Sequence, residues 1–363
     1  MRAVIVLEDG AAFKGHAFGA AKKETFGELV FNTSMSGYQE IITDPSYKGQ
    51  IVTMTYPLIG NYGVNDEDVE SDGPQVEGFV VRELCERPSN FRSGMSLDEY
   101  LKKHDVMGIT EVDTRALTRH IRLQGSMKGV LSTDTENIKQ LVKKVKASPG
   151  LVGRDLVRDA TCGKTVKWND GGRLKVAVLD CGVKHSILER LKERGCAVTR
   201  YPANTAAETI LAARPDGILL SNGPGDPEGA PYVFRTVKDL LGKVPIFGIC
   251  LGHQMLGLAL EGRTYKLKFG HHGGNHPVKD MRTGKVSITA QNHGFCVDFD
   301  SVKSKGIEVT HMNLNDDTVE GMQSDKLNFF SIQFHPEAGP GPNDAVYMFD
   351  QFVSNMRNNK RRE

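Results

Sequence analysis

The sequence predicts an α/β protein in two parts: an amino-terminal α+β domain over residues 1–150, and a carboxyl-terminal domain over residues 174–363 built on a doubly wound, mostly parallel sheet. Three observations support this prediction. The length of 363 residues suits two domains of roughly 150 residues each. Strand-like and helix-like segments alternate with short connections after residue 174 but not before it. A polar, glycine-containing stretch over residues 151–173 separates the two patterns, and we interpret it as a linker.

The amino-terminal domain opens on a predicted hairpin. Residues 3–7 form an apolar run that ends at the turn signal Glu8-Asp9-Gly10. Further strands are predicted at 29–31 and 50–55, and amphipathic patterns predict helices over 97–104, 114–123 and 135–147. Strands and helices that follow no regular alternation are typical of an α+β domain.

The carboxyl-terminal domain begins with residues 174–179, a nearly continuous apolar run expected of a strand buried on both faces. In a doubly wound parallel sheet the carboxyl ends of the strands meet at one edge, where binding and catalysis usually take place. The pattern predicts further strands at 197–201, 217–221 and 245–249, and helices at 186–194, 206–213, 231–241 and 254–260.

Composition excludes several classes of function. The chain has 46 Lys and Arg against 45 Asp and Glu, a formal net charge of +1, so it lacks the positive excess of a protein that binds nucleic acid or anionic membranes. The longest apolar stretch, 244–260, contains His253 and Gln254 and predicts no membrane helix. Six scattered cysteines without a CxxC pair indicate reduced thiols. We therefore expect a cytoplasmic protein that binds neither nucleic acid nor membrane.

Residues 248–252, Gly-Ile-Cys-Leu-Gly, carry the sharpest chemical signal. They lie where a predicted buried strand passes into a helix, in the glycine-x-nucleophile-x-glycine pattern of a nucleophile elbow with Cys250 as the nucleophile. Glycine is needed on both sides because a side chain there would collide with the adjacent strand or helix. The helix amino terminus favours a thiolate. The alternative is a buried structural cysteine beside a turn.

A second signal follows an apolar strand near the carboxyl end, where His335-Pro336-Glu337 occurs. A nucleophilic thiol needs a histidine base and a group that orients the imidazole, and Glu337 stands two residues from His335 across a stiff proline. The alternative for an isolated histidine is a surface or helix-capping role.

A third signal is Ser-Asn-Gly-Pro-Gly-Asp-Pro at 221–227, directly after a predicted strand. Its glycines and prolines predict a rigid loop whose backbone comes close to a ligand, and the N–H of Gly223 is a candidate oxyanion donor. The alternative is a simple turn that ends the strand. Neither a GxxxxGK[ST] phosphate loop nor a GxGxxG fingerprint occurs in this region.

Together these three segments resemble the class I glutamine amidotransferases. Residues 32–47, 55–63, 268–277 and 290–295 further resemble the small, glutamine-hydrolysing subunit of carbamoyl-phosphate synthase. The resemblance covers nearly the whole chain, in order.

The resemblance implies a role for each matching residue. Cys250 would attack the glutamine side-chain amide to form a γ-glutamyl thioester, His335 would act as base and then acid, and Glu337 would orient His335. The N–H groups of Gly223 and Leu251 would form the oxyanion hole. The implied glutamine-binding residues are Ser46, Gly223, Gly225, Leu251, Gln254, Asn292, Gly294 and Phe295.

The resemblance also implies a partner. Ammonia would pass through a tunnel to a large synthetase subunit, and residues 1–150 would contact that subunit. That subunit would use bicarbonate and ATP to make carbamoyl phosphate for arginine and pyrimidine biosynthesis. ATP and Mg²⁺ would bind there, so this chain is expected to hold neither cofactor nor metal. His271, His272 and His276 could chelate zinc by their spacing, but the resemblance places them in a glycine-rich structural loop.

Two alternatives stay open at this point. One is a free-standing glutaminase, or the amidotransferase part of another synthetase. The other is a regulatory module that keeps the fold without turnover.

Overall fold

A computed structural model describes residues 1–360, apart from the side chain of Ser304. The chain forms two compact units. The first contains residues 1–152 together with 268–273, and the second contains residues 153–267 and the chain from residue 274 onward.

The first unit is built on a closed barrel with the strand order β1-β2-β8-β6-β4-β3-β9. The predicted opening hairpin is confirmed, since β1 (Arg2–Leu7) pairs antiparallel with β2 (Ala12–Gly19). β9 pairs with both β1 and β3 and so closes the barrel. The other strands are β3 (Glu24–Asn32), β4 (Gln50–Met54), β6 (Gly78–Val80), β8 (Met107–Thr110) and β9 (Met127–Ser132), with a separate pair β5 (Leu58–Ile59) and β7 (Glu83–Leu84).

The first unit also contains the helices α1 to α4. α2 (Leu97–Lys103) and α3 (Thr114–Gln124) lie where the sequence predicts them, whereas α4 (Ile138–Ala147) begins three residues later than predicted. The delay has a local cause, because the Asp134 carboxylate accepts hydrogen bonds from the N–H groups of Glu136 and Asn137 and holds them in a turn. The helix α1 (Tyr38–Thr43) and the short 3₁₀ turn η1 (Pro45–Tyr47) were not predicted.

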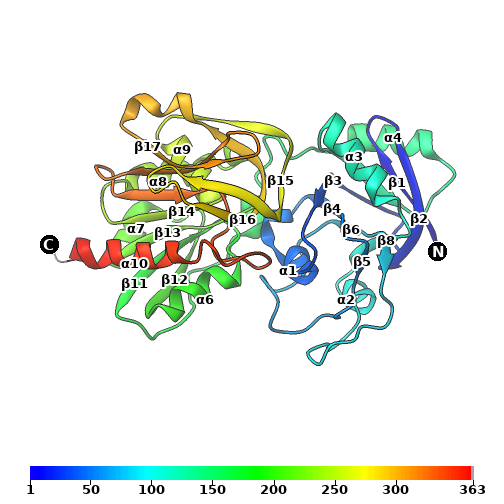
Figure 1. The fold of residues 1–363 in the computed structure, drawn as a ribbon, viewed down its shortest axis with the longest axis horizontal. Helices are drawn as coiled ribbons and strands as arrows, with labels where there is room; N and C mark the ends of the chain where they lie inside the picture. Colours follow the sequence, from blue (N-terminus) through cyan, green and yellow to red (C-terminus); the bar gives the residue numbers. More distant parts are fainter. Residues whose placement is uncertain (361–363) are drawn as a thin grey trace. The chain divides into compact units, whose positions relative to one another are not determined.

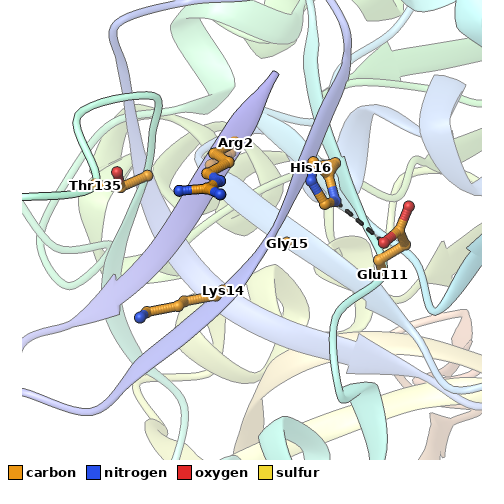
Figure 2. A pocket seen from close by; sticks show the side chains of 7 residues that line it. Arg2, Lys14, Gly15, His16, Glu111 and Thr135 are labelled. Atoms are coloured by element: carbon orange, nitrogen blue, oxygen red, sulfur yellow. Dashed lines mark hydrogen bonds and ion pairs between the residues drawn. The ribbon is translucent and has the colours of Figure 1, made fainter.

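The surface of β1 and β2 carries a pocket lined by Arg2, Lys14, His16 and Glu111 among others (Figure 2). Arg2 and His16 face each other across the two strands. The Nδ1 atom of His16 lies 3.1 Å from Oε2 of Glu111. None of the residues predicted to act in catalysis or glutamine binding lines this pocket.

A segment distant in sequence completes the first unit. The N–H of Ser126 donates to the carbonyl of Lys268 at 2.8 Å, and the N–H of Thr33 donates to the carbonyl of His272 at 3.2 Å. The rings of Phe31 and Phe269 stack with centroids 5.8 Å apart. Residues 268–273 therefore belong to this unit although they lie more than a hundred positions after its main part.

The second unit contains a sheet of 10 strands within the described residues, in the order β10-β12-β11-β13-β14-β19-β18-β17-β15-β16. The run from β12 to β19 is parallel, as the alternating sequence pattern predicts. The parallel strands are β11 (Leu174–Asp180), β12 (Cys196–Pro202), β13 (Gly217–Leu220), β14 (Ile246–Ile249) and β19 (Phe329–Ile332).

Helices cover both faces of the parallel strands, and α6 and α10 are seen on one side of them in Figure 1. Alternate residues of β11 enter opposite cores: Leu179 packs in the core that includes α7, α8 and α9, and Val178 packs in the core that includes α6 and α10. This is the doubly wound arrangement of an α/β fold. The helices are α6 (His185–Glu193), α7 (Ala207–Ala212), α8 (Pro231–Leu240), α9 (Leu251–Ala259) and α10 (Tyr347–Lys360).

The structure corrects three expectations. The sheet is parallel in its centre only, because β18 (Val319–Ser324), β17 (Glu308–Asn313) and β15 (Arg263–Asp280) extend it with antiparallel pairs towards β16 (Val286–Asp298). The stretch around His271 expected to be a loop is part of strand β15.

The third correction concerns residues 151–173, expected to be a linker. Most of this stretch belongs to the second unit, where α5 (Val157–Ala160) forms and β10 (Val166–Lys167) pairs with the edge of β12. Its polar, glycine-containing composition suits an edge strand joined by turns as well as it suits a linker. No helix of the described chain has the length and apolarity needed to cross a membrane.

Candidate active site

Cys250 lies at the bend between β14 and α9, with φ 53° and ψ −103°. β14 sits between β13 and β19 in the parallel part of the sheet, so the bend is at the carboxyl edge where functional groups gather. A Cβ atom at Gly252 would come 2.2 Å from the carbonyl oxygen of Leu220, and one at Gly248 would come 2.9 Å from the carbonyl oxygen of Gly252. The glycines around Cys250 therefore have the steric role expected of an elbow, and the cysteine takes a positive φ that only a tightly held backbone maintains.

His335 and Glu337 follow β19, the strand next to β14. Nδ1 of His335 donates to Oε1 of Glu337 at 2.7 Å, and both side chains are buried. The backbone N–H of His335 donates to the carbonyl of Ala290 at 2.9 Å and fixes the segment beside β16. Nε2 of His335 makes no hydrogen bond within the chain that the structure describes, so the nitrogen that a base needs is available.

The electrostatics of the pair favour a charged imidazole. Burial lowers the pKa of His335, but the Glu337 carboxylate and, after it, the Cys250 sulfur outweigh burial and raise the pKa to about 10. The geometry agrees with this, because β14 and β19 are paired and the N–H of Cys250 donates to the carbonyl of Ile332 at 2.9 Å, so Cys250 and His335 emerge at the same edge of the sheet. A thiolate and an imidazolium would therefore stabilise one another here.

Lys184 joins this arrangement and was not among the predicted site residues. Its Nζ donates to Oε1 of Glu337 at 2.8 Å and to the carbonyl of Ala338 at 2.7 Å, and its side chain is 2% exposed. Burial raises the pKa of Glu337, but the Lys184 ammonium and then His335 outweigh it and lower the pKa to about 2. The sequence signal was the Asp-x-Gly-x-Lys run at 180–184, in which the Asp180 carboxylate accepts from the N–H groups of Gly182 and Val183.

The loop after β13 is held against the same region. The Ser221 hydroxyl accepts from the N–H of Cys181 at 2.9 Å, and Oδ1 of Asn222 accepts from the N–H of Lys184 at 3.2 Å. A Cβ atom at Gly223 would come 2.3 Å from the carbonyl oxygen of Cys181, and Gly225 has φ +83°, so both positions require glycine.

The two predicted oxyanion donors are free. Leu251 is the first residue of α9 and Gly223 lies in the loop, and neither N–H has a hydrogen-bond partner among residues 1–360. Unused N–H groups at a helix start are well suited to hold a developing negative charge.

The predicted glutamine-binding residues divide between the units. Gln254, in α9, donates through Nε2 to the carbonyl of Phe295 at 2.8 Å, and Asn292 offers its carbonyl to the Cys250 thiol at 3.6 Å. A Cβ atom at Gly294 would meet nothing within 4 Å, which leaves open space there. Ser46 lies in η1 of the first unit, and its contribution to glutamine binding stays a prediction.

Two further residues, His293 and Gln333, make hydrogen bonds in or next to the site. His293 hydrogen-bonds through Nδ1 to the carbonyl of Phe295 and through Nε2 to Oε1 of Gln291, so it serves the local hydrogen-bond network. Gln333, which no sequence signal singled out, donates through Nε2 to the sulfur of Cys250 at 3.7 Å.

Comparison with known proteins agrees with this geometry. Residues 5–131 match the family model of the carbamoyl-phosphate synthase small chain, CPSase domain, and residues 177–355 match that of the class-I glutamine amidotransferases. Curated proteins called carbamoyl phosphate synthase small chain are 52% identical over 375 residues in Syntrophotalea carbinolica and 54% identical over 364 residues in Aquifex aeolicus. A pyrimidine-specific small chain of Bacillus subtilis is 50% identical over 353 residues.

These alignments cover 97–99% of this chain and 95–99% of the relatives. The two family models together span the barrel unit and the sheet unit that carries the Cys250 elbow. The chain therefore belongs to the carbamoyl-phosphate synthase small chain family and carries a class-I glutamine amidotransferase domain.

Proposed function

We propose that this chain hydrolyses L-glutamine at Cys250 and delivers the ammonia to a large synthetase subunit. The observation that supports this most directly is the buried pair His335–Glu337, which follows β19, the strand paired with the one that ends at the strained Cys250 elbow. Such an arrangement is that of a nucleophile, a base and an orienting group.

In the first half of the reaction, Cys250 reacts as a thiolate, because its proton is already held on Nε2 of the charged His335 imidazole. The sulfur electron pair forms a bond to the side-chain amide carbon of glutamine, and the carbonyl electron pair moves onto oxygen, which the N–H groups of Gly223 and Leu251 stabilise. When the C–N bond breaks, the imidazolium gives its proton to the leaving nitrogen. Ammonia departs and a γ-glutamyl thioester remains on Cys250.

In the second half, water attacks the thioester carbon while His335 takes a proton from the water. The C–S bond breaks, glutamate leaves, and the proton stays on Nε2 of His335 beside the restored thiolate. Glu337 keeps the imidazole in one orientation throughout, and Lys184 keeps Glu337 ionised. No step calls for a cofactor on this chain.

The partner follows from the family. A small chain implies a large one, and in this proposal the large subunit binds ATP and Mg²⁺ and converts bicarbonate and the channelled ammonia to carbamoyl phosphate. The first unit would supply contacts with it. The complex would work in the cytoplasm and serve arginine and pyrimidine biosynthesis.

The test is Cys250→Ser in the complex with the large subunit. We expect glutamine-dependent synthesis of carbamoyl phosphate to fall by about 10³-fold or more, because a serine hydroxyl is a far weaker nucleophile at neutral pH. Synthesis from added ammonia should stay at the wild-type rate, since that step belongs to the partner. Glutamine hydrolysis at the native rate in this variant would refute the proposal.

A further inference from the structure

Gln333 stands between β19 and the base His335, and its side chain is completely buried. Its backbone N–H donates to the carbonyl of Glu320 at 2.8 Å, which fixes the segment against β18. Its Nε2 lies 3.7 Å from the sulfur of Cys250, and its Oε1 lies 3.1 Å from Nε2 of Gln254. One amide thus touches both the nucleophile and a predicted glutamine-binding residue.

The hydrogen-bond partners determine which way this amide points. The carbonyl oxygen of Phe295 can only accept, so the atom of Gln254 that faces it at 2.8 Å must be the amide nitrogen. That same nitrogen faces Gln333 and needs an acceptor there, so the oxygen of Gln333 points to Gln254. The nitrogen of Gln333 is then left facing the sulfur of Cys250 as a donor.

The two polar neighbours of the sulfur act in opposite ways as it changes charge. The carbonyl of Asn292, 3.6 Å away, can accept from an S–H but repels a thiolate. The N–H of Gln333 is attracted to a thiolate more strongly than to a thiol, because a hydrogen bond to an ionised partner is roughly twice as strong as a neutral one.

We propose that Gln333 is a specific hydrogen-bond donor to the Cys250 thiolate, and that through Gln254 it ties the position of the nucleophile to the glutamine-binding residues. The inference rests on the proposed role of Cys250. It adds a second stabilising contact to the thiolate besides the imidazolium of His335. Gln333, Gln254 and Cys250 are each at least 98% buried, so water cannot replace the donor if it is removed.

The experiment is Gln333→Met, which keeps the length of the side chain but removes the donor. The rate of Cys250 alkylation by iodoacetamide is followed against pH, with the modified peptide quantified by mass spectrometry. We expect the midpoint of the alkylation profile to move up by about one pH unit, and kcat for glutamine to fall by about 10-fold at pH 7, as loss of one charge-assisted hydrogen bond implies. Ammonia-dependent synthesis by the complex should not change.

Gln323→Met is the matched control. Gln323 lies on β18 of the same sheet, and within residues 1–360 its side chain bonds to Arg282 and Glu308 and not to Cys250, so its replacement should leave the alkylation profile at wild type. Gln333→Glu gives a second reading if the Met variant folds poorly. Its carboxylate keeps the acceptor for Gln254 but repels the thiolate, and it should move the midpoint up by more than Gln333→Met does.

An unchanged alkylation profile in folded Gln333→Met or Gln333→Glu would overturn this assignment. It would leave the role of Cys250 intact as long as Cys250→Ser has lost glutamine use. Retained glutamine use by Cys250→Ser would instead overturn the proposed function itself.

Discussion

At the scale of single residues, the site depends on a row of buried charges formed by Lys184, Glu337 and His335. Lys184 and His335 both contact Oε1 of Glu337, at 2.8 and 2.7 Å. Taking charges out of water is costly, and an attractive partner offsets that cost only where the geometry is close. This row is therefore a poor source of net stability but a strict means of keeping Glu337 ionised and the imidazole in one orientation.

Removing one member of the row should destabilise the fold, because a buried charge is then left without its partner. Lys184→Met leaves Glu337 buried without its ammonium, and we expect the free energy of unfolding to fall by about 3 to 5 kcal/mol. Urea unfolding of the full chain measures it. Lys192→Met is the control, because the Lys192 ammonium pairs with Glu189 on the exposed side of α6 and should be worth about 1 kcal/mol or less. Equal effects of the two substitutions would argue against the buried row.

The same row predicts how stability depends on pH. The pKa of Glu337 is lowered to about 2, so its stabilising charge is fully present above its ordinary value of 4.5 and is lost as the pH falls through about 2. The pKa of His335 is raised to about 10, so its contribution is fully present below 6.5 and is lost as the pH rises through about 10.

The stability advantage of the wild type over Glu337→Gln should therefore be largest between about pH 4.5 and 6.5 and shrink on either side. Denaturant unfolding of both proteins across pH 3 to 9 measures this difference. A gap that stays constant over that range would contradict the assignment of both pKa shifts to this pair.

At the scale of elements, the β14–α9 connection shows how glycine positions Cys250, the proposed nucleophile. The elbow brings the start of α9 so close to the end of β13 that the N–H of Gly252 donates to the carbonyl of Ser221 at 3.0 Å. The loop after β13 and the start of α9 are thereby held together, which brings Gly223 and Leu251, the predicted oxyanion donors, to one edge of the sheet. A side chain at Gly252 would separate them.

Gly252→Ala tests this element. The added Cβ would lie 2.2 Å from the carbonyl oxygen of Leu220, which is backbone and cannot swing away. We expect a loss of about 2 kcal/mol or more in unfolding free energy, the usual cost of overpacking, together with loss of glutamine hydrolysis. Gly163→Ala is the control, since a Cβ there meets nothing within 4 Å, and it should change stability by no more than about 0.5 kcal/mol. A stable, active Gly252→Ala would show that the start of α9 can lie farther from the end of β13 without loss of function.

At the scale of the whole molecule, the chain passes twice into its first unit. Strand β15 runs through residues 268–273, which belong to the first unit, while the residues on either side of them belong to the second. Within the first unit this passage supplies Phe269, whose ring stacks on Phe31 of β3. The barrel unit therefore does not end at residue 152.

Phe269→Ala should loosen the barrel from a position outside its continuous sequence. We expect faster hydrogen exchange in β3 peptides, because they lose the stacked ring, and little change in β14 peptides of the second unit. Tyr265→Ala on the same strand is the control, as Tyr265 is 44% exposed and lies in the second unit. Equal exchange in β3 for both variants would show that residues 268–273 add nothing to the barrel.

The sequence alone predicts the parallel core of the sheet and proposes Cys250, His335 and Glu337 as site residues. The structure brings these three residues to one edge of the sheet. Their signals are local. Glycines two positions either side of a cysteine, a proline between histidine and glutamate, and strands alternating with helices each follow from short-range sterics and burial. It did not predict the closed barrel or the antiparallel extension of the sheet, because the pairing of strands depends on residues far apart in the chain.

Tertiary structure decided the remaining features, all of which join distant residues. Lys184 meets Glu337 across 153 positions, Gln333 meets Cys250 across 83, and Phe269 reaches Phe31. Residues 151–173 have the polar composition of a linker, because a short strand at the edge of a sheet, such as β10, does not need apolar residues on both faces. A buried lysine or glutamine looks like any surface residue in a sequence, since its polarity is satisfied only by partners that folding brings to it.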